Sequence, residues 1–204
     1  MIAIIDYGMG NIHSVQKALQ LYGTRTLVTN SPEDLKTCDK IILPGVGAFD
    51  DAVSQLKQKG LIQAVKDAVN KGTVFLGICL GMQILFDRSE EAKKEKGLSL
   101  IPGGVKLFEK GRGVKVPHMG WNQLRVMQKG CPLFKGLEES PYVYFCHSYY
   151  PKPASPAVNA AVCDYSGEFS AVVWDKNIYG VQFHPEKSQA AGLKMVRNFV
   201  ELEC

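Results

Sequence analysis

Strand-like and helix-like segments alternate along the first half of this chain of 204 residues. Four short apolar runs are typical of buried strands: 1–6, 26–28, 40–43 and 73–76. Apolar residues at helical spacing lie between them: Ile12, Val15, Leu19 and Tyr22; Phe49, Val53 and Leu56; Leu61, Val65 and Val69. The run from Ser31 to Asp34 is typical of a further helix start. This alternation predicts a mainly parallel sheet covered on both faces by helices.

The second half of the chain changes in character, because its signals are mainly those of strands. We expect strands over 105–108, 121–126, 142–149, 158–163 and 170–183. Residues 174–177 predict a hairpin turn, and Ser188 is expected to cap a final helix. No linker divides the chain, so residues 1–204 are predicted to be one three-layer α/β/α domain of flavodoxin-like type with a mixed, mainly parallel sheet. In such sheets ligands bind at the carboxyl ends of the strands.

Composition excludes several functional classes. The net charge of +4 is too small to predict a nucleic-acid partner, and the basic stretch from Lys106 to Lys115, with Lys110 and Arg112, is rich in glycine and favours a loop. No apolar stretch of eighteen residues and no amino-terminal signal are present, so we expect a cytoplasmic protein with no membrane partner. The six cysteines lack the close spacing of a zinc site, which predicts no metal and five reduced, structural thiols besides Cys79.

Cys79 lies in Gly77-Ile78-Cys79-Leu80-Gly81, directly after an apolar strand. A nucleophile on a sharp strand-to-helix turn needs neighbours without bulk, and the two glycines provide them. Residues 80–86 are typical of a helix start, whose free N–H groups favour a thiolate over a thiol. A small buried core cysteine is the alternative interpretation of this motif alone.

His184-Pro185-Glu186 follows a strand-like run near the carboxyl terminus. A thiol nucleophile needs an imidazole beside it, and the imidazole needs a third group that fixes its tautomer and charge. Residues two apart in extended chain face the same way, so Glu186 is expected beside the ring of His184. A surface turn is the alternative for this tripeptide alone, but together with Cys79 it predicts a Cys-His-Glu hydrolytic triad.

Pro44-Gly45-Val46-Gly47 forms a second glycine-bearing turn after the strand at 40–43. Its backbone N–H groups, together with that of Leu80, are candidates for an oxyanion hole facing Cys79. A plain strand-to-helix turn is the alternative. A phosphate-binding loop is excluded because no Gly-Lys-Ser/Thr follows.

The order of Pro-Gly-Val-Gly, Gly-Ile-Cys-Leu-Gly-Met-Gln and His-Pro-Glu-Lys-Ser resembles the class I (triad) glutamine amidotransferases. Three further segments, 6–11, 117–122 and 147–150, are similar to the glutaminase subunits of imidazole glycerol phosphate synthases of histidine biosynthesis. The resemblance covers the chain from end to end. It implies the class I amidotransferase fold, hydrolysis of L-glutamine, and no cofactor.

The resemblance also implies roles for individual residues. Cys79 would be the nucleophile, His184 the general acid and base, and Glu186 the group that orients His184. Gly47 and Leu80 would supply oxyanion N–H groups, and the positions matching those that hold glutamine are Gln83, Glu91, Ser148 and Tyr149, with His147 shaping the pocket. The implied partner is a (β/α)8-barrel cyclase subunit, joined as a heterodimer through candidate contacts Asn11, Met119, Trp121, Tyr144 and Lys187. Core burial of Trp121 and a merely solvated Lys187 are the alternatives.

Val46 departs from the related amidotransferases, which commonly carry a second glycine there. A β-branched residue resists positive φ, so we predict that the resting turn points its Val46-Gly47 peptide away from the oxyanion until a partner binds. Three other functions stay open. The first is service to another synthase, such as one making pyridoxal phosphate or anthranilate, and the second is a stand-alone γ-glutamyl hydrolase or cysteine peptidase. The third is a regulatory module, although such a module would lack Cys79, His184 or Glu186.

Overall fold

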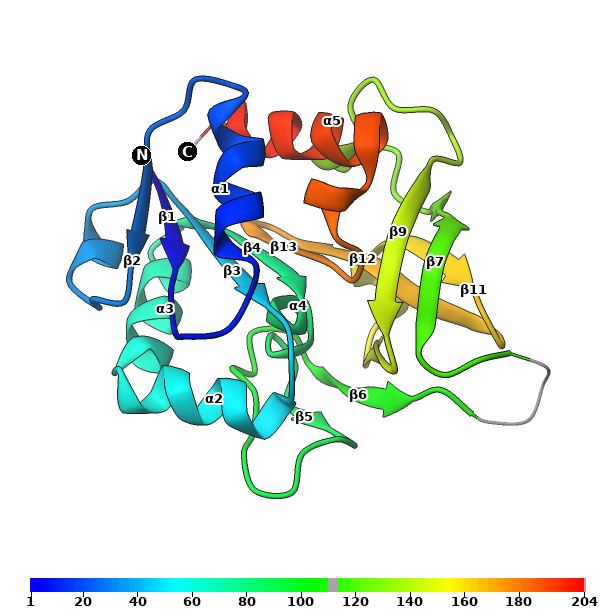
Figure 1. Cartoon of the computed structure of the whole chain (residues 1–204), viewed down its shortest axis with the longest axis horizontal. Helices are drawn as coiled ribbons and strands as arrows, with labels where there is room; N and C mark the ends of the chain where they lie inside the picture. Colours follow the sequence, from blue (N-terminus) through cyan, green and yellow to red (C-terminus); the bar gives the residue numbers. More distant parts are fainter. Residues whose placement is uncertain (110–113, 204) are drawn as a thin grey trace.

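Among residues 1–109 and 114–203, which are the ones that the computed structural model describes, eight strands form a central sheet in the order β2-β1-β3-β4-β13-β12-β11-β8 (Figure 1). Its parallel half contains β1 (Ile2–Ile5), β2 (Thr26–Thr29), β3 (Lys40–Gly45), β4 (Val74–Cys79) and β13 (Ile178–Val181). Its antiparallel half continues through β12 (Glu168–Asp175), β11 (Asn159–Asp164) and β8 (Arg125–Val126). The sheet is therefore mixed, as the sequence predicts. Lys110 and Arg112 lie outside the described residues.

Helices cover both faces of this sheet. α1 (Ile12–Gln20) and α5 (Gln189–Val200) lie on one face, and α2 (Phe49–Gln58) and α3 (Leu61–Asn70) lie on the other (Figure 1). Each helix buries one apolar stripe, and β1, β3 and β4 are buried along their whole length because both of their faces are covered. Two apolar cores result, one on each side of the sheet. This confirms the three-layer α/β/α architecture.

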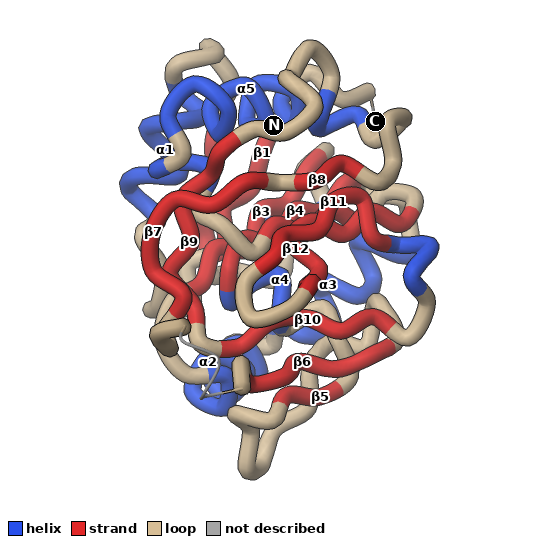
Figure 2. The backbone as a smooth tube through the Cα atoms, turned by 90° about the vertical axis from the view of Figure 1, so that its right-hand side faces the viewer, coloured by secondary structure: helices blue, strands red, loops and turns tan. Residues whose placement is uncertain are grey.

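Two smaller sheets lie beside the central one (Figure 2). One contains β10 (Tyr149–Pro153), β6 (Gly103–Leu107) and β5 (Arg88–Ser89), and the other pairs β7 (His118–Gln123) with β9 (Tyr142–His147). The predicted strand at 121–126 is therefore divided between β7 and β8, and that at 142–149 between β9 and β10. The run at 170–183 forms the β12–β13 hairpin, whose turn places Lys176 at φ 54°.

Two predicted helices are shorter than expected. The segment after Ser31 forms only a 3-10 turn, Asp34–Lys36, and α4 (Leu80–Gln83) ends at Gln83 rather than continuing to residue 86. After Gln83 the chain tightens into 3-10 turns, because the N–H groups of Leu85 and Phe86 donate to carbonyls three residues earlier, those of Met82 and Gln83. The carbonyls of residues 84–86 then accept N–H groups from the loop at 98–101 instead of a further helical turn.

Ser188 stands at the N-cap position of α5, as predicted, but its side chain does not cap the helix. Its hydroxyl donates to the carbonyl of His184 at 2.7 Å and accepts the N–H of Tyr144 at 2.9 Å. This hydroxyl therefore joins β9 to the segment that carries His184.

The described cysteines are free thiols, and Cys38, Cys131 and Cys163 are buried as structural residues would be. Burial raises the pKa of Cys131 and of Cys163 to about 12, so neither thiol ionises at neutral pH. Within the described residues, no helix has the length and apolar character needed to cross a bilayer.

Candidate active site

Cys79 ends β4 and begins α4 in a strained backbone conformation. Its φ of 54° and ψ of −109° are unusual for a residue with a side chain, as expected of a nucleophile on a tight strand-to-helix turn. A Cβ on Gly81 would lie 1.8 Å from the carbonyl oxygen of Leu43, and one on Gly77 would lie 2.5 Å from the carbonyl oxygen of Gly81. Glycine is required at both positions because backbone approaches backbone there.

His184 and Glu186 reach the same edge of the sheet from β13. β13 pairs in parallel with β4, with Val181 beside Ile78, so the segment after Val181 emerges next to Cys79. The ring Nδ1 of His184 lies 2.9 Å from Oε1 of Glu186, and the two side chains are only 5% and 2% exposed. The local chain is a 3-10 turn, Pro185–Lys187, so our premise of extended chain is wrong: this turn brings the carboxylate beside the ring.

Both Cys79 and Glu186 influence the protonation of His184. Burial lowers the pKa of this imidazole, but hydrogen bonds to the Cys79 sulfur and to the Glu186 carboxylate, with the charges of both groups, raise it to about 10. The ring is therefore cationic at neutral pH. The structure thus brings sulfur, imidazole and carboxylate together in one buried cluster.

The turn that carries the oxyanion candidates lies beside the nucleophile. Gly45 pairs with Cys79 in the β3–β4 register, and a Cβ on Gly45 would lie 2.9 Å from the backbone nitrogen of Gly81. Gly47 follows at φ 97°, whereas Val46 is not among the residues with positive φ. Gly47 and Leu80 therefore occupy neighbouring strand ends, as an oxyanion hole between them requires.

The candidate glutamine-binding residues come from three elements near this edge. The side-chain amide of Gln83, in α4, donates to the carbonyl of Tyr149 at 3.0 Å. Burial and the nearby carboxylate of Glu91 raise the pKa of Tyr149, and Glu91 itself accepts the N–H of Phe49 at 3.1 Å. Ser148 lies directly before Tyr149, and its carbonyl accepts the N–H of Phe108.

His147 is occupied by partners other than Cys79. Its Nδ1 donates to the carbonyl of Tyr149 at 2.8 Å, so its Nε2 accepts from Nδ1 of His118 at 3.1 Å. Burial lowers the pKa of His147 to about 3 and that of His118 to about 4, so both rings are neutral at pH 7. The His147 ring still lies close enough to His184 to interact with its charge.

Sequence reasoning missed two buried polar side chains next to Cys79. The amide of Gln182, which is fully buried, lies 3.7 Å from the Cys79 sulfur. The hydroxyl of Tyr7 is buried without a hydrogen-bond partner, and burial followed by the charge of Cys79 raises the pKa of Tyr7. An available signal for Gln182 was an uncharged amide in an otherwise apolar run two residues before His184.

All five candidate partner contacts are exposed or half-buried. Met119 and Trp121 are 62% and 46% exposed on β7, and the Trp121 ring stands edge-on to that of Tyr144 at 6.0 Å. Core burial of Trp121 is therefore wrong. Lys187 is exposed, whereas the side chain of Asn11 accepts the N–H of Ser14 at the start of α1.

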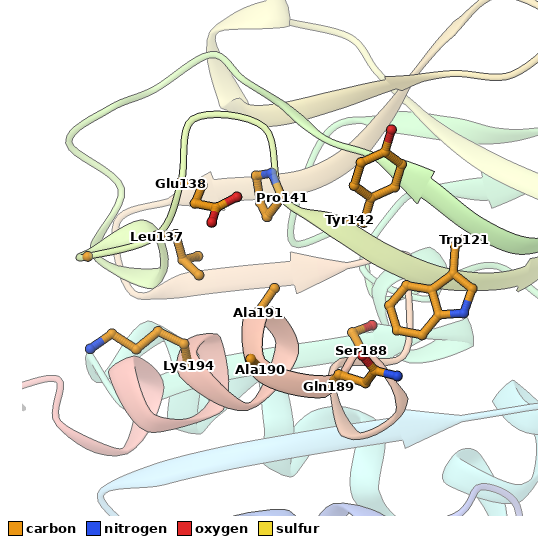
Figure 3. A pocket seen from close by; sticks show the side chains of 11 residues that line it. Trp121, Leu137, Glu138, Pro141, Tyr142, Ser188, Gln189, Ala190, Ala191 and Lys194 are labelled. Atoms are coloured by element: carbon orange, nitrogen blue, oxygen red, sulfur yellow. The ribbon is translucent and has the colours of Figure 1, made fainter.

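A groove of about 640 Å³ opens beside Trp121, between the loop at 136–142 and the first turn of α5 (Figure 3). Its lining includes Tyr142 and Ser188 but not Cys79. This groove is therefore separate from the cluster around the sulfur, although Ser188 contacts both regions.

Comparison with known proteins agrees with this arrangement. Residues 3–202 match the family described as glutamine amidotransferase class-I. The chain therefore belongs to the class I glutamine amidotransferase family.

Within this family, similarity is high to one group of subunits. The chain is 50% identical over 202 residues to the imidazole glycerol phosphate synthase subunit HisH of Acaryochloris marina, covering 98% of this chain and 94% of that protein. It is 48% identical to the HisH subunit of Syntrophotalea carbinolica, covering 99% of this chain and 100% of that protein.

Solved structures show the same fold. A glutamine amidotransferase crystal structure aligns with a TM-score of 0.77 at 19% identity, covering 98% of each chain. PurLQS from Thermotoga maritima aligns with a TM-score of 0.77 at 18% identity, covering 98% of this chain and 96% of that one.

Proposed function

We propose that this chain hydrolyses glutamine to glutamate and ammonia as the glutaminase subunit of an imidazole glycerol phosphate synthase. One observation carries the proposal: the buried His184 ring lies 2.9 Å from the carboxylate of Glu186 and close enough to the Cys79 sulfur for that group to raise its pKa. The chain is 48–50% identical to HisH subunits over nearly its whole length, which supports this synthase over those that make pyridoxal phosphate or anthranilate.

The reaction follows from the positions of these groups. The Cys79 thiolate attacks the side-chain amide carbon of glutamine, and His184 protonates the departing nitrogen, which leaves as ammonia. A γ-glutamyl thioester remains on the sulfur. The now neutral His184 takes a proton from water, which attacks the thioester and releases glutamate and the Cys79 thiolate. Glu186 holds the Nδ1 proton of the ring throughout, which keeps Nε2 directed to the reacting atoms.

The oxyanion of each tetrahedral intermediate would be held by the N–H groups of Gly47 and Leu80. Losing one such donor costs about 3 kcal/mol, or roughly a hundredfold in rate. Because Val46 resists the positive φ that a turned peptide needs, we expect the resting chain to hydrolyse glutamine slowly and the bound partner to complete the hole.

Ammonia needs an acceptor close by, because in water near neutral pH it is mostly ammonium, which is not a nucleophile. The proposed acceptor is a cyclase subunit of (β/α)8-barrel type, which would make imidazole glycerol phosphate and aminoimidazole carboxamide ribotide. The exposed pair Met119 and Trp121, with Tyr144 and Lys187, supports a docking surface near the triad. Asn11 is a further candidate contact.

A reconstitution experiment tests the proposal. Glutamate production is measured for the chain alone, with the cyclase, and with the cyclase plus its nucleotide substrate, and Cys79→Ala is the control that should abolish all of it. We expect strong stimulation by the cyclase with its substrate. Equal turnover in all three conditions would indicate a stand-alone hydrolase, and no turnover in any would indicate a module without catalysis.

A further inference from the structure

We infer that Gln182 is a further catalytic group, whose side-chain N–H donates a hydrogen bond to the reacting sulfur of Cys79. The part of this inference that concerns catalysis rests on the proposed function, whereas the contact between the two side chains is independent of it. Nε2 of Gln182 lies 3.7 Å from Sγ of Cys79, within the range of hydrogen bonds to sulfur. Neither residue is more than 6% exposed, so water does not compete for this contact.

The orientation of the Gln182 amide is determined by its neighbours. The carbonyl of Tyr149 only accepts, so the Gln83 atom 3.0 Å from it must be the nitrogen. The same nitrogen lies 3.1 Å from the Gln182 amide, so Gln182 must present its oxygen there. The nitrogen of Gln182 is thereby left facing the sulfur. The reverse orientation would set two NH2 groups against each other.

The start of this chain of hydrogen bonds is itself fixed. The carbonyl of Tyr149 also accepts from His147, whose Nε2 accepts from His118, and Nε2 of His118 lies 3.4 Å from the amide nitrogen of Asn122. Every donor in this series therefore has an acceptor, and no two donors face each other. At the other end, the backbone N–H of Gln182 donates to the carbonyl of Ala171 at 2.9 Å, which holds the residue against β12.

The chemistry of the sulfur explains what such a donor would contribute. The sulfur is negative before attack and again when the thioester breaks, and hydrogen bonds to a charged acceptor are the strong ones. His184 loses its proton to the leaving nitrogen during the reaction, whereas the amide of Gln182 stays a neutral donor at every stage. Gln182 would therefore stabilise the thiolate both before attack and as it departs, in addition to the ring of His184, which by then has taken the proton of the attacking water.

The test measures the reactivity of the thiol directly. Gln182→Met keeps the length of the side chain but removes the donor, and alkylation of Cys79 by iodoacetamide is followed by mass spectrometry from pH 6 to the high-pH plateau, about pH 10. We expect the rate at pH 7, relative to the plateau, to fall on the order of tenfold. Turnover of glutamine in the reconstituted complex should fall by a similar factor.

Asn198→Leu is the matched control. Asn198 is a buried amide that donates to the carbonyls of Leu133 and Lys135 and makes no contact with the sulfur. It should lose stability without changing Cys79 alkylation, so a merely structural effect of losing an amide is separated from an effect on the thiolate.

If Gln182→Met does not fold, Gln182→Glu keeps the shape and the acceptor for Gln83 but lacks the N–H at pH 7, and the same loss of reactivity is expected. A folded variant whose relative alkylation rate equals that of the parent would overturn the inference. A parent chain that hydrolyses no glutamine, with the alkylation difference intact, would refute the proposed function and leave the role of Gln182 standing.

Discussion

Acidification should destabilise this protein through the buried pair His118 and His147. Both rings are neutral in the fold, with pKa values lowered by burial to about 4 and about 3, whereas in the unfolded chain they titrate near 6.5. The unfolded chain therefore binds more protons below about pH 6.5. The stabilisation is fully present above that pH and is lost as the pH falls toward the folded values.

The magnitude follows from proton linkage. Each ring changes the free energy of unfolding by up to about 1.36 kcal/mol per pH unit. This applies below the unfolded pKa of about 6.5, so about 1.5 pH units of the interval from pH 7 to pH 5 contribute. That is about 2 kcal/mol for each ring, or about 4 kcal/mol for the pair. His184 acts in the opposite direction, because its pKa is raised to about 10 in the fold. It adds about 1 kcal/mol to the free energy of unfolding between pH 7 and pH 5. The expected net loss is about 3 kcal/mol.

Urea-induced unfolding at pH 7, 6 and 5, followed by tryptophan fluorescence, measures this loss. His118→Asn keeps a donor toward Nε2 of His147 but does not titrate, so it should lose about 2 kcal/mol less than the parent between pH 7 and pH 5. His13→Asn, a change at an exposed histidine, controls for the substitution itself. Equal losses in the parent and in His118→Asn would refute the reasoning, because they would show that His118 does not resist protonation in the fold.

Three substitutions test other parts of the site. Glu186→Gln keeps the shape but removes the charge that raises the pKa of His184, so steady-state glutaminase activity of the complex should fall roughly a hundredfold or more; an unchanged rate would contradict the role of Glu186. Asp50→Ala removes the carboxylate that accepts N–H groups of residues 93–95, so the loop carrying Glu91 should become more mobile. The KM for glutamine should rise roughly tenfold with a smaller change in kcat. An unaltered KM would count against a role of this loop in binding glutamine. Tyr7→Phe removes a buried hydroxyl without a partner, so urea unfolding should show equal or slightly greater stability, by up to about 1 kcal/mol; a clear loss would reveal a partner for that hydroxyl.

The parts of the fold that follow from local pattern could be predicted, and those that depend on distant contacts could not. The alternation of strands and helices gave the parallel half of the sheet, and short motifs gave Cys79 and His184 at adjoining strand ends. The carbonyls of residues 84–86, just after α4, are paired with N–H groups at 98–101, well beyond the helix in sequence. The pairing of β7 with β9 outside the central sheet is likewise a distant contact.

The site shows the same division. The motif around Cys79 reveals the nucleophile because glycine is needed where backbone meets backbone, which is a local constraint. The contacts of Gln182 are instead made with residues about a hundred positions away in sequence, Gln83 and Cys79, so no local pattern could indicate them. His118 is similar, because its partner His147 becomes its neighbour only through the β7–β9 register.

The position of His184 depends on β9 as much as on β13. The N–H of His184 donates to the carbonyl of Tyr144 at 3.0 Å, and its carbonyl accepts the hydroxyl of Ser188, which in turn accepts the N–H of Tyr144. Tyr144 therefore holds the backbone of His184 from both sides, and its ring packs against the exposed Trp121 on β7. A partner bound at Trp121 would contact the same two-stranded ribbon, β7 and β9, whose Tyr144 bonds the backbone of His184. The proposed stimulation by a docked subunit would then have a second structural route besides the Val46-Gly47 turn.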